Sequence, residues 1–148
     1  MKIYTGYIDA VSHPFPEALN RTELVNDWLE SSHPGLRNYI SRMLLPAMGG
    51  IIKKEARRVA LLRAAQTAIA IERFRLAHDG ARPDSLDQLT PVFLPSILDD
   101  PFDGQPLRYR QLDTGYVVYS IDDDLEDNDG DLEPKTRQPK DQRFRVFR

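Results

Sequence analysis

The stretch Ile51–Asp79 reads IIKKEARRVALLRAAQTAIAIERFRLAHD, and it decides how the rest of the chain folds. It contains no Pro and no Gly, its middle is rich in Ala, Leu and Ile, and Gly80 follows it. This composition favours a long α-helix, and a glycine directly after a helix readily takes the left-handed conformation that ends it. No other segment offers a comparable apolar surface. We therefore expect the later strands to pack against this helix.

One side of the helix is predicted to form the core. Its apolar members are Ala56, Val59, Ala60, Leu62, Ala65, Ile69, Phe74 and Leu76. Small alanines let another backbone approach closely, which suits a sheet laid across the helix. Lys53 and Lys54 would oppose the helix dipole if they stood in the first turn, so the helix is expected to begin earlier, at about Pro46.

The first fifty residues are predicted to form a helical N-terminal extension, separate from a domain that covers residues 51–148. Thr22–Glu30 has the pattern of a short amphipathic helix with Leu24, Trp28 and Leu29 at core spacing and a cap at Asn20 or Thr22. A second helix is predicted over Leu36–Leu45, and Pro46 is expected to end it because proline removes a helical hydrogen bond.

Beyond Gly80 the pattern changes from helix to turns and strands. Arg82–Leu89 predicts a turn that leads into a short helix, and Pro91 is its stop. Asp100–Pro106 combines Asp-Gly with flanking prolines and predicts a turn. Leu107–Arg110 and Tyr116–Ile121 are expected to form a hairpin. The alternating run Arg143–Arg148 predicts a third antiparallel strand with Phe144 and Val146 on one face.

These elements predict an α+β fold, in which one long helix packs on a small antiparallel sheet of three or four strands. A formal net charge of −3 disfavours a nucleic-acid partner, because nucleic-acid-binding domains are strongly basic. The absence of cysteine excludes disulfides and thiolate metal sites. The apolar run Ala60–Ile71 is too short for a bilayer, which needs about 20 residues, so no membrane insertion is expected in this chain.

The segment Asp122–Asp131 places seven carboxylates in ten residues with no cation among them. Calcium prefers six to eight oxygen ligands, and a loop of this composition can supply them. A solvated acidic loop without a metal is the alternative, because most charge runs are of that kind. The spacing does not match an EF-hand, since Gly130 at its sixth position would place Leu125 first and Thr136 last.

Several short motifs occur in an order that resembles the soluble domain of the type II secretion major pseudopilins. The long helix is followed by a glycine, a Pro-x-Ser-Leu-x-x-Leu segment, an Asp-Pro-Phe-Asp-Gly turn, a hairpin that ends in Tyr-x-x-Tyr-Ser, and an acidic loop. The matching residues are Ala70–Phe74, Gly80, Pro83, Leu86, Leu89, Asp100–Gly104, Leu107, Tyr109, Tyr116, Tyr119, Ser120 and Asp124. The resemblance covers roughly Ala56–Asp131, about half of the chain.

The resemblance implies a pilin-like fold and a non-enzymatic structural or interaction module that binds a protein partner, at a periplasmic or cell-surface location. It also implies calcium in the acidic loop. The implied ligands are Asp124, Asp129 and Asp131, with the Ile121 carbonyl, and then Asp122 and Asp127. The chain departs from the family because no prepilin cleavage site or apolar half-helix precedes Ile51. We therefore expect the fold without the device that anchors and stacks pseudopilins.

Two other functions are open at the level of sequence. A hydrolase or another enzyme would use the carboxylates of Asp99–Asp103 together with the acidic loop, although no catalytic motif accompanies them. An anion-binding module would use the tail 135–148, which carries six Lys and Arg residues and one Asp. A pocket in which two carboxylates meet a histidine would favour the enzyme.

Overall fold

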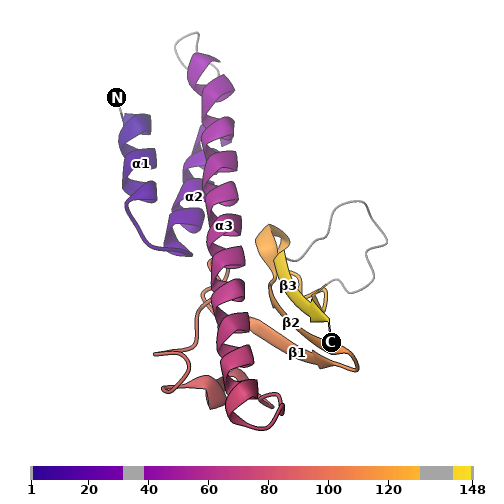
Figure 1. The fold of residues 1–148 in the computed structure, drawn as a ribbon. Helices are drawn as coiled ribbons and strands as arrows, with labels where there is room; N and C mark the ends of the chain where they lie inside the picture. The colour runs from indigo at the N-terminus through magenta and orange to yellow at the C-terminus, as the bar shows by residue number, and fades with distance from the viewer. Residues whose placement is uncertain (1, 32–38, 131–141, 148) are drawn as a thin grey trace. The chain divides into compact units, whose positions relative to one another are not determined.

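The computed structural model describes residues 2–31, 39–130 and 142–147. The chain divides into two compact units, Met1–Ala56 and Arg57–Arg148. Three helices make up most of the regular structure: α1 (Lys2–Val11), α2 (Glu17–Ser31) and α3 (Tyr39–Ala77), the last of which contributes residues to both units (Figure 1). None of the helices in the described ranges is long and apolar enough to cross a bilayer.

In the first unit, α1 and α2 lie side by side, and most of the buried residues are small. Ala10, Ala18, Thr22, Ile52 and Ala56 are all at most 8% exposed. A side-chain carbon on Gly49 would lie 3.1 Å from the Asn26 amide nitrogen, so the α3 backbone passes close to α2. Such close contacts between backbones are what small residues permit.

Two predictions about this region are wrong. The helix does not stop at Pro46, because α3 begins at Tyr39 and continues through Pro46 and Gly49-Gly50. Tertiary packing outweighs local propensity here, as the contact of Gly49 with α2 illustrates. Leu24 and Trp28 are 68% and 55% exposed rather than buried, because α2 turns Ala18, Leu19 and Thr22 inward.

Two further features of the first unit differ from the prediction. The predicted cap at Thr22 lies inside α2, where its hydroxyl donates to the Ala18 carbonyl over 2.7 Å. The helix α1 has no counterpart among the predicted elements. Residues 36–38 of the predicted second helix lie outside the described residues.

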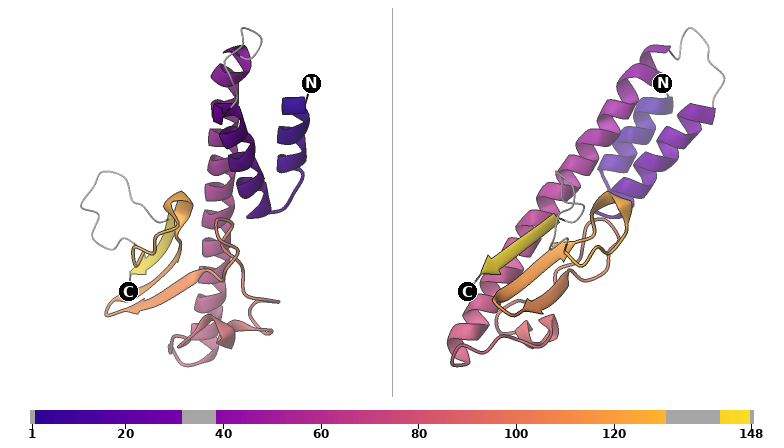
Figure 2. Two further views of the ribbon diagram at one scale, coloured as in Figure 1. Left: turned by 180° about the vertical axis from the view of Figure 1, so that it is seen from behind. Right: turned by 90° about the vertical axis from the view of Figure 1, so that its right-hand side faces the viewer.

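The second unit contains a three-stranded antiparallel sheet of β1 (Arg108–Leu112), β2 (Gly115–Ser120) and β3 (Gln142–Phe147), in the order β1-β2-β3. The predicted hairpin and the predicted third strand are therefore both confirmed. Tyr116 pairs with Val146 and Val118 with Phe144, so these four residues share one face of the sheet. Figure 2 shows the sheet lying along the C-terminal half of α3.

The long helix packs on this sheet, as predicted, through its small residues. The core cluster consists of Ala64, Ala68, Ala70, Ile71, Phe74, Leu86, Leu89, Leu94, Leu107, Tyr116 and Val118. The Tyr116 hydroxyl donates to the Ala68 carbonyl over 3.1 Å, which ties β2 directly to the helix backbone. Leu86 and Leu89 belong to a short 3-10 helix, Leu86–Leu89, at the position where a short helix was expected.

The buried face of α3 is rotated from the predicted one. Of the predicted face, Ala56, Ala60 and Phe74 are buried, whereas Leu62, Ile69 and Leu76 are 50%, 63% and 77% exposed. Ala64, Ala68 and Ile71 are buried in their place. The sheet and the following turns approach the helix where its side chains are smallest. The large aliphatic residues, which the sequence pattern assigned to the core, consequently face outward.

Candidate functional site

The turn Asp99–Pro106 is closed by its own backbone. The Asp100 N–H donates to the Gln105 carbonyl over 2.7 Å, and the Gly104 N–H donates to the Asp100 carbonyl over 2.9 Å. Gly104 has a φ of 73°, a conformation that glycine adopts without strain. The Arg63 side chain on α3 donates to the Asp99 carbonyl over 2.6 Å, so the turn is also fixed to the helix.

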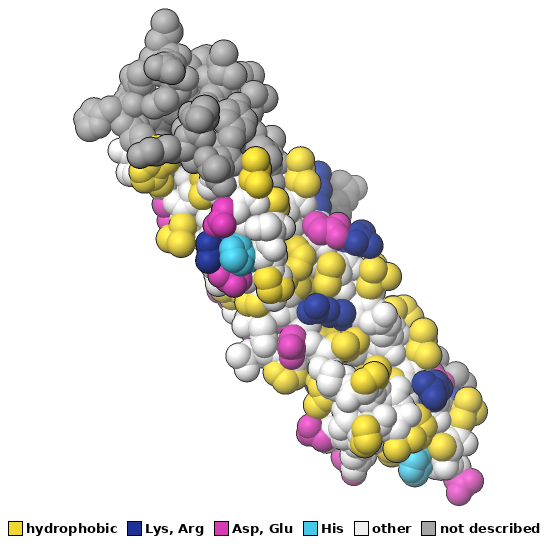
Figure 3. All heavy atoms as spheres, turned by 90° about the vertical axis from the view of Figure 1, so that its left-hand side faces the viewer, with side chains coloured by type: hydrophobic (Ala, Val, Ile, Leu, Met, Phe, Trp, Pro, Cys, Tyr) yellow, Lys and Arg dark blue, Asp and Glu magenta, His cyan; other side chains and the backbone are white. Residues whose placement is uncertain are grey.

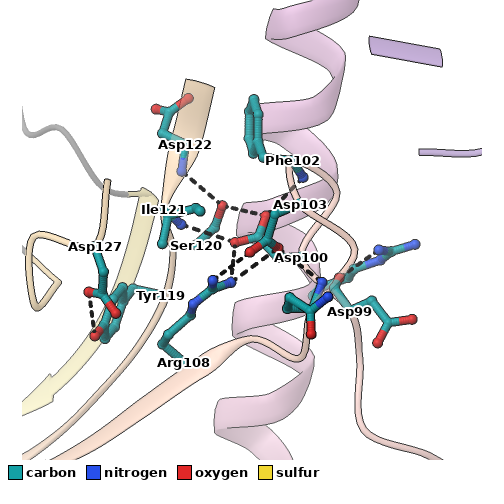
Figure 4. Close-up of polar contacts among 12 residues, drawn as sticks. Asp99, Asp100, Phe102, Asp103, Arg108, Tyr119, Ser120, Ile121, Asp122 and Asp127 are labelled. Carbon is teal, nitrogen blue, oxygen red and sulfur yellow. Dashed lines mark hydrogen bonds and ion pairs between the residues drawn. The ribbon is translucent and has the colours of Figure 1, made fainter. Parts of the chain in front are cut away.

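The Asp100 carboxylate joins this turn to the end of β2 (Figure 4). It is fully buried and accepts four hydrogen bonds: from the Phe102 N–H at 3.0 Å, the Ser120 hydroxyl at 2.9 Å, the Ile121 N–H at 3.0 Å and Arg108 Nη1 at 3.1 Å. We call this set of contacts the Asp100 network. Burial raises the pKa of Asp100, while its hydrogen bonds to Phe102, Ser120 and Ile121 act in the opposite direction.

Arg108 connects Asp100 to the second aspartate of the turn. Its Nη2 lies 2.5 Å from Asp103 Oδ2, and its Nη1 donates to Asp103 Oδ1 over 3.2 Å. Burial alone would raise the pKa of Asp103, but the hydrogen bonds from Arg108 and from the Gln105 N–H outweigh it and lower that pKa. The two aspartates of the turn thus share one arginine and occupy different environments.

The acidic loop begins directly after the Asp100 network, and Arg57 forms ion pairs with its first two carboxylates. Arg57 Nε donates to both oxygens of Asp122, over 2.8 and 3.0 Å, and its Nη2 donates to Asp123 over 2.6 Å. Asp122 is 3% exposed and has a φ of 58°. The hydrogen bond with Asp122 raises the pKa of Arg57. A cation from α3 therefore fixes the start of the loop.

The rest of the loop is held by residues of the sheet. The Tyr119 hydroxyl donates to Asp127 over 3.0 Å, and the same Asp127 oxygen accepts the Asp129 N–H over 2.9 Å. Arg110 on β1 lies 3.3 Å from the exposed Asp129 carboxylate. Arg143 on β3 donates to the Gly130 carbonyl over 3.0 Å. Side chains of the long helix and of all three strands thus contact the described part of the loop.

The predicted calcium ligands are not brought together in the described ranges. No group of three or more His, Asp or Glu side chains there has a geometry that would hold a metal ion. Asp122 is engaged by Arg57, Asp127 by Tyr119, and Asp129 by Arg110, while Asp124 accepts the Glu126 N–H over 3.2 Å. The Ile121 N–H belongs to the Asp100 network. Asp131 lies outside the described residues.

The carboxylates proposed for an enzyme have structural partners. Asp100 is saturated with donors, and Asp103 is paired with Arg108. His78 stacks on Phe74 at 3.9 Å, and His13 lies near Asp9 and Glu17, so neither meets the Asp99–Asp103 turn. His33 and most of the basic tail, residues 135–141 and 148, lie outside the described residues.

Sequence reasoning missed the three arginines that matter most here. The sequence pattern predicted no role for Arg57, Arg108 or Arg110. A run of acids without an internal cation must find compensation elsewhere, and this was the available signal.

Comparison of the chain with protein-family models, with curated proteins and with solved structures found no match.

Proposed function

We propose that the chain is a non-enzymatic structural or interaction module similar to the soluble domain of a type II secretion major pseudopilin. The observation that carries the proposal is the Asp100 network. The Asp-Pro-Phe-Asp-Gly turn and the Tyr-x-x-Tyr-Ser strand are separate motifs of the resemblance, and the Asp100 carboxylate bonds the first to Ser120 and Ile121 at the end of the second.

The surface of α3 supports an interaction role. Leu62, Ile69 and Leu76 are exposed at seven-residue spacing, which places them on one side of the helix. Figure 3 views the molecule from the side away from the sheet and shows apolar side chains at the surface, separated by polar and charged ones. Mixed surfaces of this kind are typical of non-obligate protein interfaces.

Photo-crosslinking in cells of the source organism tests this function. A photoreactive phenylalanine analogue at Ile69 is expected to form adducts with subunits that carry a prepilin N-terminal segment, since Ile69 is 63% exposed on the helix. The same analogue at exposed Gln88, on the 3-10 helix, is the control. Mass spectrometry identifies the adducts. Adducts that contain no pilin-type subunit, or equal adducts at both positions, would contradict the proposal.

Calcium binding by the acidic loop stays a prediction, with Asp124, Asp129 and Asp131 and the Ile121 carbonyl as its first ligands and Asp122 and Asp127 as further ones. A ligand bound only by the folded state raises the free energy of unfolding by about 2.7 kcal/mol at a hundredfold excess over Kd. Chelator-treated protein is therefore expected to melt at a higher temperature when calcium is added, and magnesium serves as the control. A melting temperature that calcium leaves unchanged would refute this prediction.

A further inference from the structure

A small cavity lies between the end of α3 and the β1–β2 hairpin. Its volume is about 140 Å³, and its lining residues are Glu72, Arg75, Gly80, Arg82, Gly115 and Tyr116. Pockets for drug-sized ligands measure roughly 300–1,000 Å³, so this one suits only a ligand of a few heavy atoms. Gly80 and Gly115 have no side chain, so only their backbone atoms line the cavity.

Arg82 is held in this wall by one end of its guanidinium group. Its Nη1 donates to the Leu112 carbonyl over 2.9 Å and also to the Gly115 carbonyl. Within the described residues Arg82 has no other hydrogen bond, so Nε and Nη2 have no protein acceptor. These two nitrogens form the side-on edge of the guanidinium, which matches the two oxygens of a carboxylate or a phosphate.

The cavity wall also carries excess positive charge. Among the described lining residues Glu72 is the only acid, and Glu72 Oε2 accepts from Arg75 Nε and lies near Arg75 Nη2, each over 3.1 Å. The other oxygen, Oε1, accepts from the Tyr116 hydroxyl over 3.2 Å. Glu72 thus neutralises Arg75, and the charge of Arg82 is left uncompensated among the lining residues.

We propose that this cavity binds a small oxyanion, a carboxylate or a phosphate group, on the side-on edge of Arg82 with Arg75 beside it. Neither the module function proposed above nor the acidic loop requires this site. The ligand is recognised by two parallel N–H···O bonds from a guanidinium already fixed by two backbone carbonyls. A lysine at position 82 would supply the charge without the paired donors.

Titration of the full chain with inorganic phosphate and with acetate, at constant ionic strength maintained with chloride, tests the proposal. The Arg82 Nε–H resonance in the NMR spectrum is expected to shift saturably at millimolar concentrations. Tighter binding of phosphate would assign the site to phosphate groups, and tighter binding of acetate would assign it to carboxylates such as a chain terminus. No saturable shift with either anion overturns the proposal.

Two variants of opposite expected effect sharpen the test. Arg82→Gln should weaken anion binding by at least about tenfold, because one paired guanidinium contact is lost. Glu72→Gln should tighten it several-fold, because Arg75 loses its neutralising partner while Arg82 keeps its two carbonyl contacts. Arg73→Gln, on the same helix but outside the cavity, should change nothing. If Arg82→Gln does not fold, Glu72→Gln decides: affinity unchanged from the native chain contradicts the proposal.

Discussion

Replacing Asp100 by Asn is expected to lower the free energy of unfolding by about 2–3 kcal/mol, the upper part of the range for a buried donor that loses its acceptor. The side chain keeps its shape, and one oxygen still accepts from Phe102 and Ser120. The other oxygen becomes an NH₂ group that faces two donors, the Ile121 N–H at 3.0 Å and Arg108 Nη1 at 3.1 Å. The buried Ile121 N–H would then have no acceptor, and Arg108 Nη1 would keep only its hydrogen bond to Asp103.

Urea unfolding followed by far-UV circular dichroism measures this effect. Asp99→Asn is the matched control, because Asp99 is the preceding residue, its side chain is exposed, and only its carbonyl bonds to Arg63. Its expected effect is within about 0.5 kcal/mol, as for ordinary surface substitutions. Equal effects of the two substitutions would mean that the Asp100 network does not hold the turn to the sheet.

The part of the fold that the sequence predicts is the part with regular spacing. Alternation in Arg143–Arg148 and turn residues around Gly115 were enough to place β3 and the hairpin, because a strand with one buried face is specified by period two. The rotation of α3 was not predictable in this way. Alanine, leucine and isoleucine are all apolar, and the buried side was chosen by how closely the sheet approaches, which favours Ala64 and Ala68 over Leu62.

The sequence showed which residues make up the acidic loop and the turn, but it did not show which residues they contact. The acidic run was plain in the sequence, but its partners are far along the chain: Asp122 and Arg57 are 65 positions apart. Asp100 was assigned to a turn, which is correct, yet its carboxylate reaches Ser120, 20 positions away. Contacts of this kind depend on tertiary structure, and a local sequence pattern does not predict them.

Removing the charge of Arg57 is expected to lower the free energy of unfolding by about 2 kcal/mol in the Arg57→Gln variant, from the typical strength of hydrogen bonds to charged groups. The Asp122 side chain is only 4% exposed and would lose its ion pair with Arg57. Arg57 itself is 39% exposed, so solvent screening keeps the effect below that of a fully buried pair. Lys54→Gln removes an exposed cation from the same helix and is expected to change stability by at most about 0.5 kcal/mol.

A double-mutant cycle of Arg57→Gln with Asp122→Asn isolates the pair. Asparagine is tolerated at the positive φ of 58° that Asp122 adopts, so the second substitution adds little backbone strain. The expected coupling energy is about 1–2 kcal/mol, within the range for residues in direct contact. A coupling near zero would show that the loop is not anchored by Arg57. Because Asp122 is held by a guanidinium from α3, the loop's first carboxylates have a cation whether or not a metal binds, and the coupling should persist in chelator.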